Sequence, residues 1–186
     1  ERARGGAGLL MTEFTCVDGT DGFSSNVPQL RLDNERYKAG HAQLAAAIHA
    51  GGARAVIQIS HAGRQTKESV IGTTPVSASA IPLRSIYMSG APRALEDHEI
   101  RRIVASYANT ARLAMMAGYD GVMLHGAHGY LLQQFLSPLM NHRDDDWGGD
   151  FERRLRFPLE VIKAVKAQIG DKPLLYRMSV VDGVAD

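Results

Sequence analysis

Short apolar runs that alternate with long helix-like stretches constrain the fold of this chain more than any other feature of its sequence. Four such runs occur, and a glycine or a turn sequence precedes each, as expected where a helix ends and a strand begins. The runs are GLLMTEF (8–14), RAVIQIS (54–60), GVMLH (121–125) and PLLYRMS (173–179). Their short length, and the β-branched residues of the second run, are typical of buried parallel strands.

The stretches between these runs have the composition and spacing of helices. The predicted helices cover 34–50, 97–117 and 151–169. Asp33 or Asn34 is the expected cap of the first helix. In the second and third, apolar residues recur at spacings of three and four, which gives each helix one stripe that faces a sheet. Pro158 either kinks the third helix or marks the first turn of its second half.

The alternation of strands and helices predicts an α/β fold built from parallel βαβ units. Successive runs are further apart than such a unit needs, and the excess falls in the loops after the strands. (β/α) barrel enzymes keep their active sites in those loops, and open doubly wound sheets use the equivalent switch points. A barrel is favoured here because no G-x-G-x-x-G sequence follows any of the runs.

Composition excludes several classes of protein. The chain has 186 residues, 45% of them hydrophobic, and a formal net charge of +1, so it has a core to bury and no basic surface for nucleic acid. No apolar run is long enough to span a bilayer, and no leader pattern is present. A single cysteine, Cys16, favours a reducing compartment, and we expect a cytoplasmic protein without a nucleic-acid or membrane partner.

Polar side chains gather at the carboxyl ends of the predicted strands. Gln58 lies within AVIQI, and Arg177 lies between two large side chains in the last strand. His125, His128 and Tyr130 follow the third strand within a few residues. A buried amide without a partner costs about 1–3 kcal/mol, and a buried charge needs a counter-charge or a ligand. One planar polar ligand above the strand ends would satisfy both Gln58 and Arg177.

Simpler explanations exist for these two groups. Gln58 is equally well explained by a hydrogen bond to a neighbouring side chain. Arg177 is equally well explained by a salt bridge to Glu13 or Asp182. Under these alternatives the strand ends carry no ligand.

The histidines also have alternative interpretations. His125 and His128 have the spacing of metal ligands, with His142 or the acidic run 144–146 as further donors, although H-x-x-H is a weak signal beside H-E-x-x-H. We expect the helical histidines to be solvated: His41, His49 and His98. The run RDDDWGGDFERR (143–154) is interpreted as a structural charged face, held by local Arg–carboxylate pairs around a glycine turn.

Several blocks of the sequence resemble the old yellow enzyme family of flavin oxidoreductases, most of all its bacterial branch with the 2,4-dienoyl-CoA and 2-enoate reductases. The blocks are LLMTEF, IQISHAGR, PVSASAIP, HGAHGYLLQQFLSPLMNHRDDDWGGDFERRLRFPLEVIKAVK and YRMSVVDG. The similarity runs over nearly the whole chain. Its most specific part extends from His125 to Arg154, where many spaced residues match in order.

The resemblance implies an eight-stranded (β/α)8 TIM barrel that binds FMN at the carboxyl ends of its strands. It places Gln58 at the pyrimidine edge of the flavin, which an amide suits because it both donates and accepts hydrogen bonds. Arg177 is placed beside flavin N1 and the C2 carbonyl, where a fixed cation favours the reduced, anionic ring. Phe14 is placed against the flavin, at a position where relatives often carry a smaller residue.

The same resemblance implies roles for the residues after the third strand. His125 and His128 match the pair that holds the carbonyl oxygen of the substrate. Tyr130 matches the acid that protonates the α-carbon, while flavin N5 gives hydride to the β-carbon. The activity implied is therefore reduction of the activated C=C bonds of enones or enoates, with NADH or NADPH as the hydride source and no metal.

Counting strands against the family leads us to expect a partial barrel. Residues 1–186 correspond to one incomplete FMN-binding domain with strands two to five, without the first strand and the last three βα units that carry the phosphate loops. Two alternatives stay open: a metal-dependent TIM-barrel hydrolase or lyase, and a segment that is inactive alone and serves as a folding or interaction unit. The expected partner is a small-molecule substrate, and the sequence leaves a homo-oligomer open.

Overall fold

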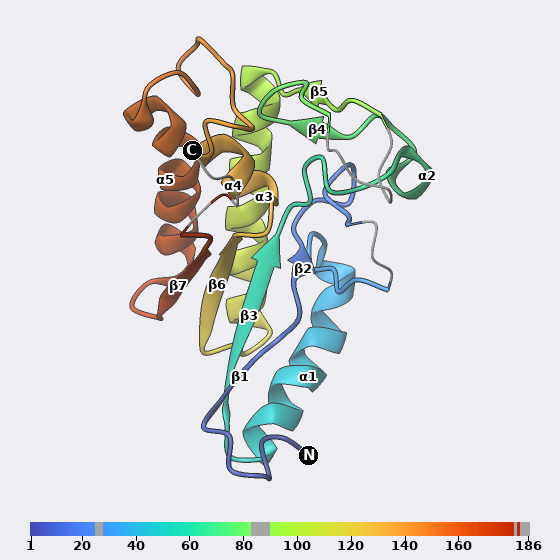
Figure 1. Ribbon diagram of the computed structural model, residues 1–186. Helices are drawn as coiled ribbons and strands as arrows, with labels where there is room; N and C mark the ends of the chain where they lie inside the picture. The colour runs from blue at the N-terminus through green and yellow to red at the C-terminus, as the bar shows by residue number, and fades with distance from the viewer. Residues whose placement is uncertain (25–27, 83–89, 181, 183–186) are drawn as a thin grey trace.

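The four predicted strands form one parallel sheet in the computed structural model, which describes residues 1–24, 28–82, 90–180 and 182 (Figure 1). The order across the sheet is β1, β3, β6, β7, and every pairing is parallel. These strands are β1 (Leu9–Met11), β3 (Arg54–Ser60), β6 (Gly121–Gly126) and β7 (Leu174–Met178). The architecture is that of a partial (β/α) barrel, which confirms the predicted fold class.

The first apolar run, 8–14, is not one strand as predicted. It gives β1 and then, after a break, β2 (Thr15–Cys16), and both pair with β3. Met11 is opposite Val56 and Thr15 is opposite Ile59, so four steps on one strand match three on the other. The extra residue makes a bulge between β1 and β2, a feature that redirects side chains next to active sites.

The predicted helices are present with nearly the predicted bounds. They are α1 (Lys38–Ala50), preceded by the 3-10 turn η1 (Glu35–Tyr37), α3 (Asp97–Met116) and α5 (Phe151–Ile169). Asn34 caps η1 by accepting a hydrogen bond from the Arg36 N–H. Pro158 lies inside α5, which continues through it.

Short elements lie in the loops after the strands. They are α2 (Glu68–Ile71), α4 (Leu131–Leu136), β4 (Val76–Ser77) and β5 (Arg93–Ala94). β4 and β5 form a small parallel pair near the carboxyl ends of the main strands (Figure 1). No helix in the described part of the chain is both long and apolar enough to cross a membrane.

The alternation of side chains along the strands gives the sheet two different faces. Ile57, Ile59, Val122 and Leu124 pack in one cluster with apolar residues of α1, α3 and α5. The residues between them point the other way, so Gln58 shares the opposite face with its register partner Met123 and with His125 and Arg177. The helices thus cover one face, and the polar groups predicted from the sequence lie together on the other.

The expectation of solvated helical histidines is wrong for His41. Its side chain is buried, and its ring nitrogens lie 3.0 Å from the Tyr119 hydroxyl and 3.0 Å from the Arg31 carbonyl oxygen. Burial lowers the pKa of His41. His49 is partly exposed and pairs with Asp120, and His98 is exposed. An alanine-rich helix gives no amphipathic stripe from which the buried side of His41 could be predicted.

The charged run 143–154 is held by local ion pairs, as predicted. The pairs are Arg143–Asp145, Arg153–Asp150 and Arg156–Asp146. Arg143 does more than pair locally, because its guanidinium also donates to the carbonyl oxygens of Ala78 and Leu95. This arginine therefore ties the run to the residues that directly follow β4 and β5.

Asp120 joins α1 to two strands at the amino end of the sheet. Its carboxylate accepts hydrogen bonds from the Ala55 N–H and from Arg54, and His49 Nε2 lies 2.7 Å away. Although burial raises the pKa of Asp120, these partners lower it to about 2. The carboxylate therefore stays charged across the whole neutral range.

Replacing this group predicts a measurable loss of stability. Asp120→Ala should lower the free energy of unfolding by about 1–3 kcal/mol, because the Ala55 N–H loses its side-chain acceptor. Asp146→Ala removes an exposed partner of Arg156 and should change it by less than about 0.5 kcal/mol. Urea unfolding of both variants checks this, and equal losses would contradict the role of Asp120.

Candidate active site

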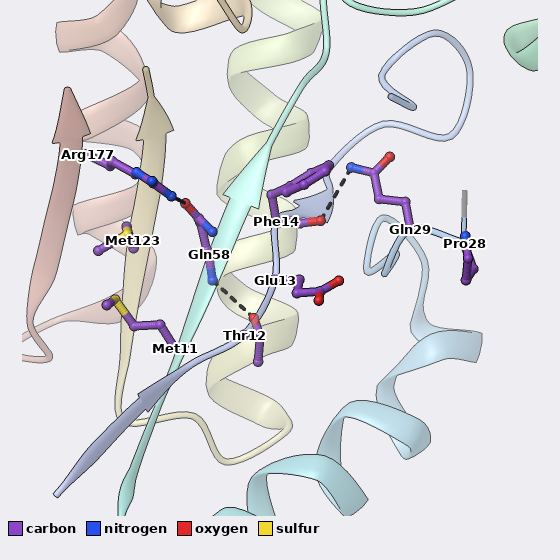
Figure 2. Close-up of a pocket in the computed structure, with 9 residues that line it drawn as sticks. All are labelled: Met11, Thr12, Glu13, Phe14, Pro28, Gln29, Gln58, Met123 and Arg177. Atoms are coloured by element: carbon purple, nitrogen blue, oxygen red, sulfur yellow. Dashed lines mark hydrogen bonds between the residues drawn. The ribbon is translucent and has the colours of Figure 1, made fainter. Parts of the chain in front are cut away.

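A pocket of about 770 Å³ lies on the polar face of the sheet, at the bulge between β1 and β2 (Figure 2). Its volume is within the range of about 300–1,000 Å³ that small-molecule sites occupy. It is lined by Met11, Thr12, Glu13, Phe14, Pro28, Gln29, Gln58, Met123 and Arg177. Three of the residues predicted from the sequence, Phe14, Gln58 and Arg177, therefore share one cavity.

Gln58 and Arg177 point toward each other across the sheet (Figure 2). Arg177 Nη1 donates to Gln58 Oε1 at 3.5 Å, although the two residues belong to strands separated by β6. Gln58 is buried, whereas Arg177 is exposed. Among the ion pairs of the described residues, none joins Arg177 to Glu13 or Asp182, so the salt-bridge explanation of this arginine finds no support.

The pocket also contains residues that sequence reasoning missed. Thr12 accepts a hydrogen bond from the Gln58 N–H at 3.3 Å, and Gln29 donates to the Phe14 carbonyl oxygen at 3.4 Å. Met11 and Met123 add apolar surface. The position of Met123 could have been predicted from the sequence, because it lies two residues before His125 on the same strand and so on the same face. The position of Gln29 could not have been predicted, because its contact with the pocket depends on the path of the loop after β2.

Four rings lie together beside the pocket. The centroid of His125 is 4.7 Å from that of Tyr130, 5.1 Å from that of His128 and 6.1 Å from that of Phe14. Phe14 and Tyr130 are 5.5 Å apart. His125 is the register partner of Arg177, which links the rings to the Gln58–Arg177 pair. The structure thus brings together all six residues predicted to form the site.

His125 is the most strongly perturbed group of the site. Only 1% of it is exposed, and burial, followed by the proximity of His128 and Arg177, lowers its pKa to about 4. The imidazole is therefore neutral at pH 7. Its Nδ1 is buried without a hydrogen-bond partner among the described residues, which is costly unless a ligand supplies one.

Comparison with known proteins agrees with this geometry. A model of the NADH:flavin oxidoreductase / NADH oxidase family matches residues 1–186. The "NADH oxidase" of Thermoanaerobacter brockii is 46% identical over 181 residues, which are 96% of this chain and 27% of that protein. The structure of morphinone reductase in complex with tetrahydroNAD matches with a TM-score of 0.88 at 34% identity, over 95% of this chain and 52% of the other.

A second solved structure that resembles this chain carries the name of the family. The old yellow enzyme homologue from Zymomonas mobilis matches with a TM-score of 0.87 at 30% identity, over 95% of this chain and 51% of that chain. This chain belongs to the old yellow enzyme family. It spans about half the length of the two matched structures and about a quarter of the NADH oxidase. Family membership implies FMN as the cofactor, and a relative from Clostridium acetobutylicum, 36% identical over 97% of this chain and 52% of that protein, is named an NADPH dehydrogenase.

The pocket suits the ring system of FMN on its own chemistry. Met11, Met123 and Phe14 offer apolar surface to a flat aromatic ligand. Gln58 and Arg177 offer an amide and a guanidinium to a polar ring edge. In an old yellow enzyme relative this combination is what the isoalloxazine ring of FMN requires, with one apolar body and one edge of alternating donors and acceptors.

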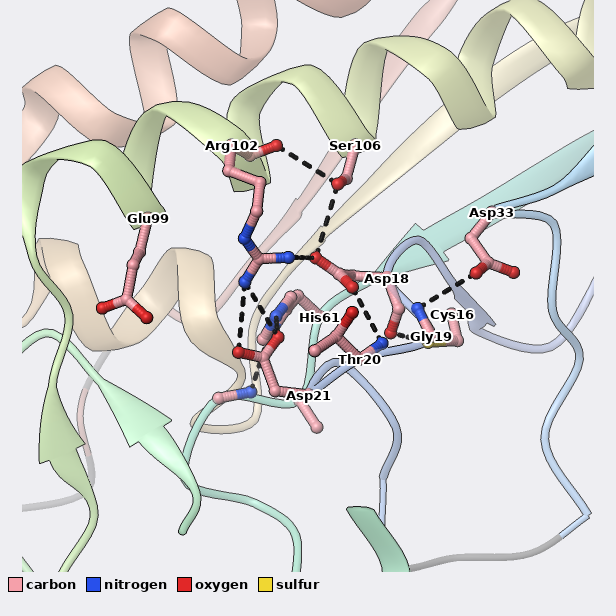
Figure 3. Close-up of polar contacts among 12 residues, drawn as sticks. Cys16, Asp18, Gly19, Thr20, Asp21, Asp33, His61, Glu99, Arg102 and Ser106 are labelled. Carbon is pink, nitrogen blue, oxygen red and sulfur yellow. Dashed lines mark hydrogen bonds and ion pairs between the residues drawn. The ribbon is translucent and has the colours of Figure 1, made fainter. Parts of the chain in front are cut away.

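The loop after β2 is anchored by a buried polar network (Figure 3). His61 Nε2 lies 3.1 Å from Asp21, and His61 Nδ1 accepts from the Gly63 N–H, so Nε2 is the nitrogen that donates to Asp21. Arg102 of α3 pairs with Asp18 and Asp21. Although burial raises the pKa of Asp21, His61 and Arg102 lower it to about 2. This network fixes the loop that leads to the pocket wall.

The same network is relevant to the alternative that the protein is a metal-dependent hydrolase or lyase. Asp18, Asp21 and His61 are the one cluster of metal-ligating type in the described part of the chain, and the guanidinium of Arg102 already contacts both carboxylates. His125 and His128 are not in that cluster, and His142 contributes its backbone N–H to Ser79. Within the part of the chain that the structure describes, the predicted histidine pair therefore belongs to no cluster of three potential metal ligands.

The depressed pKa of His125 predicts how stability depends on pH. The unfolded imidazole titrates near pH 6.5 and the folded one near pH 4, so the unfolded state takes up the proton first as the pH falls. The contribution of His125 to the free energy of unfolding is therefore fully present above pH 6.5. It decreases by on the order of 3 kcal/mol as the pH falls from 6.5 to 4.

Urea unfolding at pH 7.5 and pH 4.5 measures this effect. The free energy of unfolding should fall less between the two pH values in His125→Asn than in the parent protein, because the variant lacks this imidazole. The other acid-sensitive groups are the same in both proteins, so their effects cancel in the comparison. His98→Asn removes an exposed imidazole and serves as the matched control. Parallel pH profiles of parent and His125→Asn would contradict the assignment.

Proposed function

We propose that the protein is an FMN-dependent oxidoreductase that reduces the activated C=C bonds of enones or enoates, with NADH or NADPH as the hydride source. The observation that carries this proposal is the meeting of the Gln58–Arg177 pair with His125, His128 and Tyr130 on one face of the sheet. Family membership supports the cofactor, and the arrangement of the rings supports the substrate chemistry.

Gln58 and Arg177 would hold the polar edge of the flavin. The Thr12 hydroxyl accepts from the Gln58 backbone N–H, and Arg177 donates to the side-chain oxygen of Gln58. These two contacts orient the side-chain amide, whose NH₂ group is then available to the flavin. Arg177 places a fixed positive charge at the same edge, where negative charge develops on reduction. When bound there, FMN would supply the hydride chemistry that links NAD(P)H to the β-carbon of the substrate.

His125 and His128 would bind the carbonyl oxygen of the substrate. A neutral imidazole has one N–H to donate, and the low pKa of His125 keeps it in that form at pH 7. Two donors on one oxygen polarise the C=C bond and favour hydride at the β-carbon. Tyr130 would give its phenolic proton to the α-carbon, so the bond gains one hydride and one proton while NAD(P)H becomes NAD(P)⁺.

The cofactor assignment is tested by FMN titration of the intact protein. Gln58→Met and Arg177→Met should each raise the dissociation constant at least tenfold, since each removes a charged or amide contact of roughly 1.5–3 kcal/mol. Quenching of FMN fluorescence measures it. Arg156→Met, on α5 and paired with Asp146, is the matched control and should leave the constant unchanged. A parent protein that binds no FMN would refute the proposal.

The role of Tyr130 is tested by separating the two half-reactions. Tyr130→Phe keeps the ring among its aromatic neighbours and removes only the hydroxyl. Reduction of bound FMN by NADPH should remain within about threefold of the parent, whereas turnover of an enone should fall about 10²- to 10⁴-fold. Stopped-flow absorbance resolves the two steps, and unchanged enone turnover would remove Tyr130 from this role.

A further inference from the structure

His128 has a backbone conformation that a residue with a side chain rarely adopts. Its φ is +59°, the one positive value at a non-glycine position among the described residues, and Gly129 follows with a φ of +72°. Two successive left-handed residues turn the chain sharply between β6 and α4. Such outliers persist only where the surroundings enforce them, and they gather at functional sites.

Side chains satisfy every backbone polar group of these two residues. The His128 N–H donates to Ser179 Oγ at 3.3 Å, and the Gly129 N–H donates to Gln133 Oε1 at 2.7 Å. The His128 carbonyl oxygen accepts from Gln65 at 2.5 Å, and the Gly129 carbonyl oxygen accepts from Gln134 at 2.6 Å. The Tyr130 N–H donates to the Ala127 carbonyl oxygen at 3.2 Å and closes the turn. Its shape therefore depends on this backbone bond together with four side chains.

Gln133 is the centre of this arrangement. Its Oε1 also accepts from the Ser179 hydroxyl at 3.2 Å, and its Nε2 donates to Asp182 at 2.6 Å. The side chain is buried, and it lies on α4, one turn after the left-handed pair. One amide thus connects the Gly129 backbone to the segment that follows β7, the strand of Arg177.

We propose that Gln133 is a positioning residue for substrate recognition by His128, an inference that rests on the proposed function. His128 is exposed, and its ring meets that of His125 edge-on. His125 is the one ring that it contacts among the described residues, so the direction of the His128 ring depends largely on the backbone of residues 128 and 129. By fixing that backbone, Gln133 holds the second imidazole where both can donate to one carbonyl oxygen.

The experiment compares two changes at Gln133. Gln133→Met keeps the length of the side chain and removes all its hydrogen bonds. The double variant Gln133→Glu with Asp182→Asn exchanges donor and acceptor between the two side chains, and it keeps an acceptor for the Gly129 N–H. Gln168→Met, at an exposed position of α5, is the matched control. Ser179→Ala is a second test, because it removes the acceptor of the His128 N–H and the hydrogen bond from the Ser179 hydroxyl to Gln133 but leaves the contact of Gln133 with the Gly129 N–H.

Two measurements follow each variant. Amide hydrogen exchange of His128 and Gly129, measured by NMR without flavin or substrate, should accelerate at least tenfold in Gln133→Met and at His128 in Ser179→Ala. In the FMN-loaded protein, KM for an enone should rise at least tenfold in Gln133→Met while kcat changes less than threefold. The exchanged pair should restore both quantities to within threefold of the parent, and Gln168→Met should alter neither.

Unchanged exchange in Gln133→Met or Ser179→Ala would overturn the proposal, and so would faster exchange with an unchanged KM. Failure of the exchanged pair to restore KM would also overturn it, since a structural role alone predicts no such rescue. A parent protein that binds FMN but reduces no enone refutes the proposed function and, with it, the recognition role. The exchange rates then still show whether Gln133 holds the turn.

Discussion

The parallel register of β3, β6 and β7 is the constraint on which the site depends. It places Gln58 beside Met123 and His125 beside Arg177, two adjacent rows on the same face of the sheet. The helices cover the other face with apolar residues, so polar groups on the open face need each other or a ligand. A shift of one residue in any of these strands would turn one of these side chains into the core.

Much of this architecture could be predicted from the sequence, because strand and helix periodicity are local properties. The bounds predicted for β3 and α5 agree with the structure residue for residue. The bulge between β1 and β2 could not be predicted, because it shows only in how residues 11–15 pair with a strand more than forty residues away. The burial of His41 was not predicted for the same reason, since its partner Tyr119 lies 78 residues further along the chain.

The site itself was predictable where a polar side chain interrupted an apolar strand. Gln58, Arg177 and His125 all gave that signal, and the structure gathers them with Phe14, His128 and Tyr130. Their roles in binding and proton transfer stay predictions. The glutamines that hold the site were not predictable in this way, because α4 is too short for its sequence to show which of its side chains are buried. Only the fold shows that Gln133 and Gln134 are buried.

His125 and His128 are positioned by different physical effects. His125 is buried in a strand, where desolvation keeps it neutral and leaves Nδ1 without a partner among the described residues. His128 is exposed on a turn that hydrogen bonds from four side chains hold in a left-handed conformation. Both arrangements cost stability in the ligand-free protein, one through desolvation and one through backbone strain. A carbonyl ligand that accepts from both imidazoles would recover part of that cost, so substrate binding and protein stability are coupled at this loop.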